Sequence, residues 1–250
     1  MKLSAIIITK NAEQTIRRCI ESVAWAQEIV VVDSGSTDRT VEICRELGAK
    51  IHQTPDWPGY GPQKNRALDL ACGHWVLSLD SDEWVTPDLR ATIERALAAP
   101  GNKAAFAIPR RSSFCGRLMR HSGWWPDYVV RLFRRDAAQF SADNTHERLI
   151  VNGSTGKLKQ PLMHEAITSL EQMLNKMNVY STNTALMFHQ RGRRASLFTA
   201  LLHAGWAFMR TYFLRLGFLD GREGFMLAVA NAEGSYYRYL KLMLLGEEQR

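Results

Sequence analysis

Three acidic side chains follow directly on an apolar run, and their spacing suits metal chemistry. The segment HWVLSLDSDEWV, residues 74–85, reads as a buried strand that ends in Asp80, Asp82 and Glu83. Because an unpaired buried charge is costly, acids at a strand end must face water, a cation or a network of donors. Asp80 and Asp82 share one side of an extended chain, so both could bind one Mg²⁺ or Mn²⁺ ion that in turn holds a diphosphate.

Two other apolar runs also end in small polar or acidic groups. The run LSAIIIT ends in Thr9 and continues with Lys10 and Asn11, and the run EIVVVD ends in Asp33, with Asp38 shortly after it. Ligands of open α/β sheets bind outside the carboxyl ends of the strands, so these groups are expected on the same rim as the acidic segment. Taken singly, Asp33 and Asp38 could instead be turn and capping residues.

The elements that must position these groups alternate between strand and helix. Helical spacing marks four segments of the first hundred residues: 12–26, 36–49, 61–73 and 86–99. We expect Ser36 or Thr37 to cap the second helix and Gly48 to end it, and Thr86 to cap the fourth. Strands that alternate with helices predict βαβ units, hence an α/β fold with a mostly parallel central sheet flanked by helices.

After Pro100 the pattern changes. Residues 104–114 and 128–136 look like strands on either side of a loop rich in Arg, Gly and Trp, and the chain is helical from about residue 167. We therefore predict a domain over 1–165, with halves 1–100 and 101–165, and a helical extension over 166–250.

The overall composition fits a folded protein with anionic partners. Of 250 residues, 46% are apolar and 23% charged, and the formal net charge is +7. Four widely spaced cysteines argue against a zinc knuckle or a disulfide framework. Without a signal peptide, a run of roughly 18 apolar residues or a nucleic-acid motif, the chain is expected to be cytosolic, not to span a membrane and not to bind nucleic acid.

The ordered segments AIIITKN, VVDSGSTDRT and GYGPQKNRALDLACGHWVLSLDSDEWV strongly resemble the inverting, nucleotide-sugar-dependent glycosyltransferases of family 2, which have the GT-A fold. The later segments MRHSGWWPDYVVRLFRRD, NTHERL and RTYFLRLGFLDGREGF are similar to the lipopolysaccharide core β-1,4-glucosyltransferase branch, over nearly the whole chain. A lone DxD motif is weak evidence for a glycosyltransferase, but the ordered combination of these segments is specific to the family. The Rossmann-like GT-A architecture follows from this resemblance.

The resemblance also implies roles for individual residues. The UDP-sugar donor is expected to be bound by Thr9, Lys10, Asn11, Asp33, Lys64, Arg66, Asp80 and Ser81. Asp82 is the expected direct metal ligand, with Asp80, and His164 is a candidate third ligand. Alternatively, Lys64 and Arg66 could belong to a solvated helix face, and His164 could be structural.

An inverting transfer needs a base that takes the proton of the acceptor hydroxyl. The family places an acid for this downstream of the DxD motif, and its position favours Glu147. His146 is a competing base or an orienting partner, and Asp143 is a third candidate. The segment DNTHERL departs from the Glu-Asp pair that is commoner in the family.

A basic, Trp-containing segment follows the first domain half and could bind the acceptor. Arg suits bidentate capture of phosphate and carboxylate, and an indole face suits a sugar ring. The candidate acceptor-binding residues are Arg110, Arg117, Arg120, His121, Trp124, Trp125 and Arg131. The alternative is a basic surface loop with a buried Trp pair.

The segment 196–219 has one broad apolar face at helical spacing, with Trp206 and several Phe, and Arg191, Arg193 and Arg194 precede it. A basic amphipathic helix of this kind suits the surface of an anionic membrane. It could equally pack on the catalytic domain, or join subunits of an oligomer through the C-terminal helices.

These patterns together predict a peripheral-membrane hexosyltransferase on the inner face of the cytoplasmic membrane. It would transfer glucose from UDP-glucose to a heptose of the lipopolysaccharide inner core. Three alternatives stay open: a family 2 enzyme with a polyprenyl-phosphate or polysaccharide acceptor, a nucleotidyltransferase, and an inactive membrane scaffold. TKNAEQT, after the first strand, lacks the Gly-rich basic loop usual in nucleotidyltransferases, and a scaffold would not need the full acidic set.

Overall fold

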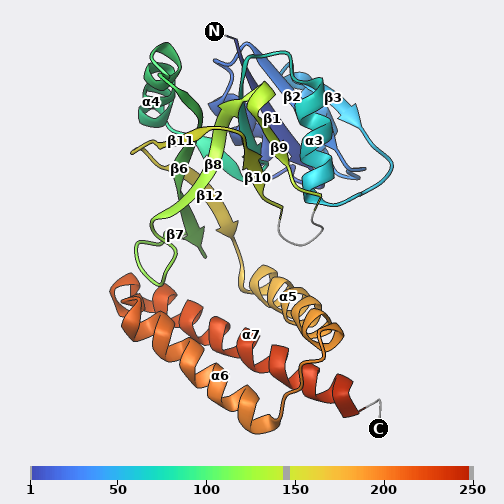
Figure 1. Cartoon of the computed structure of the whole chain (residues 1–250), viewed down its shortest axis with the longest axis vertical. Helices are drawn as coiled ribbons and strands as arrows, with labels where there is room; N and C mark the ends of the chain where they lie inside the picture. Colours follow the sequence, from blue (N-terminus) through green and yellow to red (C-terminus); the bar gives the residue numbers. More distant parts are fainter. Residues whose placement is uncertain (1, 143–146, 248–250) are drawn as a thin grey trace. The chain divides into compact units, whose positions relative to one another are not determined.

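The computed structural model describes residues 2–142 and 147–247 and contains two compact units (Figure 1). The first unit consists of residues 1–110 and 127–164, and the second of residues 111–126 and 165–250.

The first unit begins with the predicted alternation of strands and helices. Its first elements are β1 (Leu3–Thr9), α1 (Ile16–Ser22), β2 (Glu28–Asp33), α2 (Thr40–Glu46), β3 (Lys50–Gln53), α3 (Tyr60–Leu70), β4 (Trp75–Asp80), β5 (Glu83–Val85) and α4 (Pro87–Ala98). The later elements are β6 (Lys103–Phe114), β8 (Asp127–Arg134), η1 (Arg135–Ala137), β9 (Ala138–Phe140), β10 (Leu149–Val151), β11 (Ser154–Lys157) and β12 (Leu162–Ile167). Strands β6 and β12 continue into the second unit.

The main sheet has the strand order β3-β2-β1-β4-β8-β6-β12-β5. β3, β2, β1 and β4 are parallel, and β8 adds antiparallel to β4. The α/β class and the parallel arrangement of the first four strands are therefore as predicted. The consequence for the site is that β1, β2 and β4 end at one edge of the sheet.

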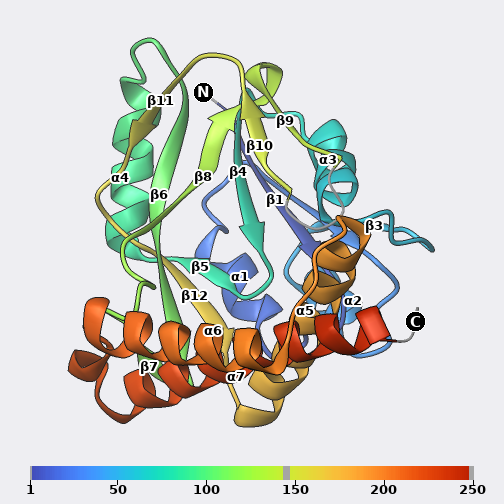
Figure 2. The same ribbon diagram turned by 60° about the horizontal axis from the view of Figure 1, so that its bottom comes forward.

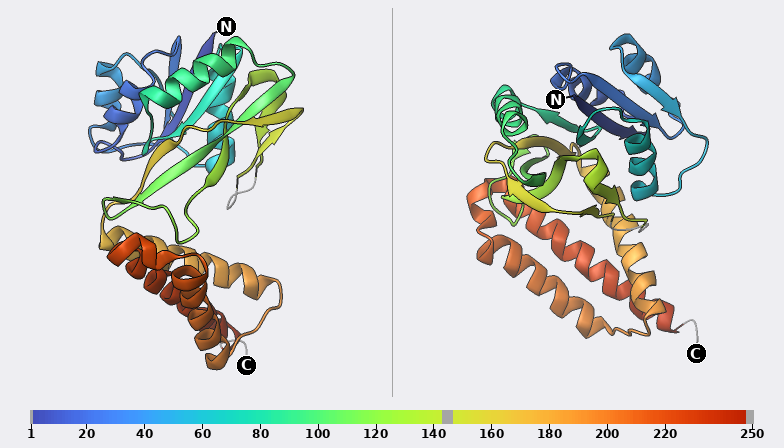
Figure 3. Two further views of the ribbon diagram at one scale, coloured as in Figure 1. Left: turned by 90° about the vertical axis from the view of Figure 1, so that its left-hand side faces the viewer. Right: turned by 45° about the horizontal axis from the view of Figure 1, so that its top comes forward.

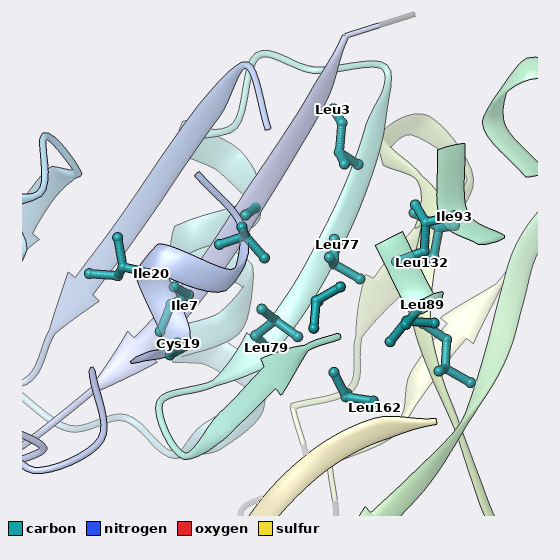
Figure 4. Packing of buried hydrophobic residues seen from close by; sticks show 14 of the residues in the cluster. Leu3, Ile7, Cys19, Ile20, Leu77, Leu79, Leu89, Ile93, Leu132 and Leu162 are labelled. Atoms are coloured by element: carbon teal, nitrogen blue, oxygen red, sulfur yellow. The ribbon is translucent and has the colours of Figure 1, made fainter. Parts of the chain in front are cut away.

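Both faces of the parallel half are covered, as the continuous apolar run of β1 predicts. All seven residues of β1 are buried. Leu3 and Ile7 pack with Cys19 and Ile20 of α1 on one face (Figure 4). Ile6 and Ile8 instead join the cluster that α3 covers on the other face. Because β1 is packed on both faces, its polar end at Thr9 is held in a fixed place at the edge of the sheet.

Two helix starts differ in how well the sequence predicts them. α4 begins as expected, because the Thr86 hydroxyl accepts from the Leu89 amide at 3.2 Å. The expected cap of α2 by Ser36 or Thr37 is wrong: the helix starts at Thr40, after an N-cap residue without a side-chain cap. Ser36 and Thr37 are instead held by Asp33 and Asn11, which draws the loop toward the strand ends.

The second unit contains the predicted helical extension. Its elements are β7 (Arg117–Leu118), α5 (Leu170–Gln190), α6 (Leu197–Met209), the π-helical turn η2 (Arg210–Leu214), η3 (Gly217–Asp220) and α7 (Gly221–Glu247). Helices α6 and α7 pack side by side, and α5 packs along α7 (Figures 2 and 3). In the described ranges no helix combines the length and apolar character needed to cross a bilayer.

The helix expected across 196–219 is interrupted. α6 ends at Met209, the π-helical turn follows, and Leu216 adopts a left-handed φ of 55°. A Cβ atom on Gly217 would lie 2.7 Å from the carbonyl oxygen of Thr211, so the chain doubles back where only glycine fits.

Candidate functional site

The carboxyl ends of three parallel strands form the rim on which the site is built. Thr9 of β1 is in register with Asp33 of β2, and Ile8 is in register with Asp80 of β4. The predicted donor-binding residues at the ends of these strands therefore lie at one level of the sheet.

Asp33 organises the loop that follows β2. Its side chain is fully buried; Oδ2 accepts from the amides of Gly35 and Ser36 at 3.0 Å each, and Oδ1 accepts from the Ser36 hydroxyl. Gly35 has a φ of +78°, a conformation that favours glycine. The Asn11 amide donates to the same Ser36 hydroxyl at 2.8 Å, so the loops after β1 and β2 are joined.

Two further polar groups lie close to this rim. The Thr9 hydroxyl is buried and has no hydrogen-bond partner within the described part of the chain. Gln63 of α3 is fully buried, and its amide donates to Ser34 at 3.0 Å and to Thr54 at 2.8 Å. The sequence interpretation assigned no role to Gln63, although it lies in the segment GPQKN that carried the family resemblance.

Asp80 lies between two buried cations. Lys64 Nζ is 2.9 Å from Asp80 Oδ1, and Arg131 Nη2 contacts Asp80 Oδ2. The side chains of Lys64 and Arg131 are only 4% and 7% exposed. Burial alone would raise the pKa of the Asp80 carboxyl, but the charges of Arg131 and Lys64 outweigh burial and hold the pKa well below its usual range.

Glu83, named in the acidic segment but given no role, supports this arrangement. It is fully buried; Oε2 accepts from the Asp80 amide at 3.0 Å, and Oε1 accepts from Arg131 Nη2 at 2.6 Å. Arg110 Nη1 approaches the same carboxylate at 3.7 Å. Burial raises the pKa of Glu83, and the attraction of Arg131 offsets this only in part. Glu83 therefore fixes both Arg131 and the backbone of the acidic turn.

Asp82 and His164 form the second half of the predicted metal set. Antiparallel pairing of β12 with β5 places His164 opposite Glu83, and His164 Nε2 lies 3.5 Å from Asp82 Oδ2. Their side chains are 32% and 15% exposed. A carboxylate and an imidazole at this separation could share one ion. Among the described residues, no cluster of three or more His, Cys, Asp or Glu side chains has metal-binding geometry.

Glu147, the predicted base, lies next to Asp80 through a shared cation. Its Oε1 is 3.0 Å from Lys64 Nζ, and its side chain is 25% exposed. Lys64 thus bridges two acids that the sequence separates by 67 positions. The competing bases His146 and Asp143 lie outside the described residues.

The remaining donor-side candidate on α3 has a local partner. Arg66 forms two hydrogen bonds with Asp56, at 2.7 and 2.9 Å, and a third at 3.0 Å with Gln63 Oε1. Lys10 is exposed, and Ser81 is partly exposed in the acidic turn.

The predicted acceptor-binding residues divide between the units. Arg110 and Arg131 belong to the first unit, at Glu83, and Arg110 also contacts Asp127 at 2.7 Å. The others lie in the second unit: Arg117, Arg120, His121, Trp124 and Trp125.

In the second unit a residue without a predicted role anchors this loop. The buried Asp220 accepts from the amides of Arg120 and His121 and from the Ser122 hydroxyl, at 2.9 to 3.1 Å. Trp124 packs edge-on against Phe114, with ring centroids 5.9 Å apart. Local sequence pattern does not mark Asp220 as an anchor, because its partners lie about a hundred positions upstream.

The fold and the site together describe an α/β protein with acids and buried cations at the ends of its parallel strands, and comparison with known proteins identifies its family. The family described as "Glycosyl transferase family 2" matches residues 4–158. The chain belongs to glycosyltransferase family 2 and is a glycosyltransferase, as the sequence predicts. The GT-A fold expected of this family agrees with the observed α/β architecture and helical extension.

Two relatives match over nearly the whole chain. An uncharacterized glycosyltransferase of Rickettsia typhi is 32% identical over 261 aligned residues, which cover 100% of this chain and 89% of the relative. The lipopolysaccharide core biosynthesis glycosyltransferase LpsC of Rhizobium meliloti is 30% identical over 251 aligned residues, which cover 96% of this chain and 90% of LpsC. Among solved structures, residues 1–349 of Staphylococcus aureus TarS align at 18% identity with a TM-score of 0.48, covering 100% of this chain and 92% of that one.

Proposed function

We propose that this family 2 enzyme transfers a hexose, glucose from UDP-glucose, to a heptose of the lipopolysaccharide inner core with inversion at the anomeric carbon. The observation that carries the proposal is the Lys64 bridge between Asp80 and Glu147. It joins the strand-end acids predicted for the donor to the acid predicted for the acceptor. The similarity to LpsC, named for lipopolysaccharide core biosynthesis, supports the acceptor class.

The donor nucleotide would bind over the ends of β1 and β2. The buried Thr9 hydroxyl lacks a partner in the described ranges, so a ligand group there would satisfy it. Asn11 and Asp33 hold the adjoining loops through Ser36 and Thr37, which preorganises the rim for the uridine. Lys10, Arg66 and Ser81 would contribute polar groups at its edges.

Asp82 and His164 would hold the divalent ion, and the DxD pattern with Asp80 supports this choice. Their donor set, one carboxylate and one imidazole 3.5 Å apart, fits an ion that takes its other ligands from diphosphate and water. The bound Mg²⁺ or Mn²⁺ would supply charge neutralisation at the departing diphosphate.

The acceptor side would use Glu147 as the base. The acceptor hydroxyl oxygen attacks the anomeric carbon, the bond from that carbon to the diphosphate oxygen breaks, and the hydroxyl proton passes to the Glu147 carboxylate. Lys64, at 3.0 Å, would orient this carboxylate. His146 and Asp143 stay alternatives for the same step.

Each unit contains some of the arginines that we propose for acceptor recognition. Arg110 and Arg131 lie at Glu83 in the first unit. In the second unit the backbone of the loop is fixed by Asp220, which leaves Arg117, Arg120 and the two Trp side chains as recognition groups for an acidic, phosphorylated sugar.

The apolar face of α6 would lie on the anionic membrane surface. Several large apolar side chains of this helix are more than half exposed, with Phe198 at 74%, Leu202 at 61% and Trp206 at 56%. Arg191, Arg193 and Arg194 precede the helix, so positive charge borders the apolar stripe. We accordingly place the enzyme on the inner face of the cytoplasmic membrane; an oligomer through these helices is the competing use of the same face.

Calorimetric titration tests the proposal directly. UDP-glucose, UDP-galactose and GDP-mannose are titrated with Mn²⁺ present and again after EDTA. We expect UDP-glucose to bind, and to lose most of its affinity in EDTA. Binding of no nucleotide sugar would overturn the catalytic proposal in favour of a scaffold. A transfer assay tests the acceptor: transfer to a polyprenyl phosphate and not to a heptose acceptor would show that the proposed acceptor is wrong and that the polyprenyl-phosphate alternative is right.

A further inference from the structure

The second unit contains a pocket of about 400 Å³ whose wall carries three guanidinium groups and no carboxylate. Residues 122–124, α6, the π-helical turn η2 and α7 contribute to it, and all of them belong to the second unit. The guanidinium groups of the wall come from Arg210, Arg215 and Arg238, and His203 also lines it.

The three arginines have no anionic partner in the part of the chain that the structure describes, where no carboxylate comes within ion-pair distance of them. Arg238 Nε is buried and without a hydrogen-bond partner there. A buried N–H group without an acceptor is unfavourable, so this donor calls for an acceptor from outside the chain. By contrast, Arg222 at the start of α7 is exposed and paired with Glu223.

The backbone around the pocket makes room for Arg215 and joins it to the loop of residues 122–124. A Cβ atom on Gly123, whose φ is +81°, would lie 2.2 Å from Arg215 Nη1, so the arginine side chain rests on a glycine that leaves room for it. The Ser122 amide donates to the Arg215 carbonyl at 2.8 Å. Arg210 begins the π-helical turn, an irregularity that is frequent at functional sites.

Ring surfaces complete the pocket. His203 stacks on Tyr239 with ring centroids 4.1 Å apart and an interplanar angle of 13°. Trp124 and Trp206 also line the wall, and Trp206 is 56% exposed. Flat rings beside arginines suit a ligand that has both an anionic group and an apolar or sugar-like body.

We propose that this pocket binds a phosphate monoester. A phosphomonoester has a charge of about −1.5 to −2 at neutral pH, which several guanidinium groups can match with bidentate hydrogen bonds. The nearby buried acid Asp220 accepts from the hydroxyl of the wall residue Ser122 and from the amides of Arg120 and His121, so its charge is already compensated by three donors. The carrier of the phosphate is a lipid or a sugar.

Calorimetry of the full chain with three soluble probes distinguishes the carriers. The probes are dihexanoyl phosphatidic acid below its micelle concentration, glucose 6-phosphate and inorganic phosphate. Preference for the first identifies a lipid phosphate, and preference for the second identifies a sugar phosphate; either supports the pocket. Equal, non-saturating heats for all three would overturn it.

Matched variants tie the binding to the pocket. Arg238→Gln and Arg215→Gln should each lower the affinity for the preferred probe by about tenfold or more, because each removes a charge-assisted hydrogen bond. Arg222→Gln removes the same charge outside the pocket and should change the affinity less than about twofold. Equal losses in all three variants would show unspecific surface charge and refute the site.

Two readouts keep the result separate from folding and from the proposed reaction. Arg215 is exposed, so Arg215→Gln tests the site even if Arg238→Gln lowers the melting temperature. UDP-glucose affinity, measured on the same samples, should be unchanged in the pocket variants. Absence of UDP-glucose binding in the wild type would defeat the proposed function without affecting the phosphate titration.

Discussion

Replacing Lys64 with methionine should expose the electrostatic dependence of the candidate site. Lys64 Nζ lies 2.9 Å from Asp80 and 3.0 Å from Glu147, and its side chain is 4% exposed. Methionine keeps most of the volume but leaves two carboxylates without their shared cation. Removing one partner of a buried ion pair costs about 3–5 kcal/mol, and the lower end, about 3 kcal/mol, is expected here because Arg131 still compensates Asp80.

Urea unfolding followed by circular dichroism measures this loss, and Lys50 provides a matched control. Lys50 pairs with Glu28 at 2.7 Å, but its side chain is 63% exposed and solvent screens the pair, so Lys50→Met should cost far less stability than Lys64→Met. If the two variants lose equal stability, the bridge does not depend on burial and the reasoning fails.

The double variant Lys64→Met/Glu147→Gln separates the two halves of the bridge. Neutralising Glu147 removes the carboxylate that Lys64→Met leaves without this cation, while Arg131 still compensates Asp80, so the double variant should regain about 1 kcal/mol relative to Lys64→Met. Strict additivity of the two single changes would show that Lys64 and Glu147 do not interact in solution, whatever their separation in the structure.

Three other perturbations test separate parts of the site and the fold. Asp82→Asn should abolish transfer and weaken UDP binding in Mn²⁺ with little change in stability, whereas wild-type turnover would exclude Asp82 as a metal ligand. Glu147→Gln should remove transfer and leave UDP affinity near normal, and undiminished transfer would move the base to His146 or Asp143. At Glu28, burial raises the pKa, but hydrogen bonds from the Cys72 amide, Lys50 and Ser4 outweigh it and lower the pKa from 4.5 to about 2. Because the folded-state pKa is depressed, the stabilisation by Glu28 is present above the unfolded-state pKa and is lost as the pH falls through the folded-state pKa. Glu28→Gln should therefore cost about 1–3 kcal/mol of unfolding free energy at pH ~6 and almost nothing near pH ~2. A cost that does not change with pH would contradict this.

The strand ends could be predicted from the sequence because each depends on local pattern. A continuous apolar run marks a strand covered on both faces, and the polar residue that ends it must emerge at the carboxyl edge. Thr9, Asp33 and Asp80 were assigned to one rim on that basis, and the register of β1, β2 and β4 places them there.

The partners of those residues could not be predicted in the same way. Lys64 meets Glu147 across 83 positions, and Arg131 meets Glu83 across 48. Nothing in local spacing encodes such pairs, because each joins residues that are far apart in the sequence and meet only in the folded chain. The interruption after Met209 could not be predicted for a related reason: the apolar periodicity continues through 210–216, whereas the close approach of Gly217 to the Thr211 carbonyl is a backbone contact that periodicity does not encode.

We propose that the two aspartates of the DxD motif have different tasks, although the sequence presents them as a pair. Both oxygens of Asp80 contact buried cations, so a divalent ion there would have to compete with Lys64 and Arg131 for the carboxylate. Asp82 is a third exposed and faces an imidazole, which is the better environment for a direct ligand. In this proposal the main role of Asp80 is to compensate the charges of the buried Lys64 and Arg131 side chains. Its neutralisation to Asn should therefore reduce stability more than Asp82→Asn does, and Asp82→Asn should reduce Mn²⁺-dependent UDP binding more than Asp80→Asn does. The opposite order in both measurements would assign the metal to Asp80.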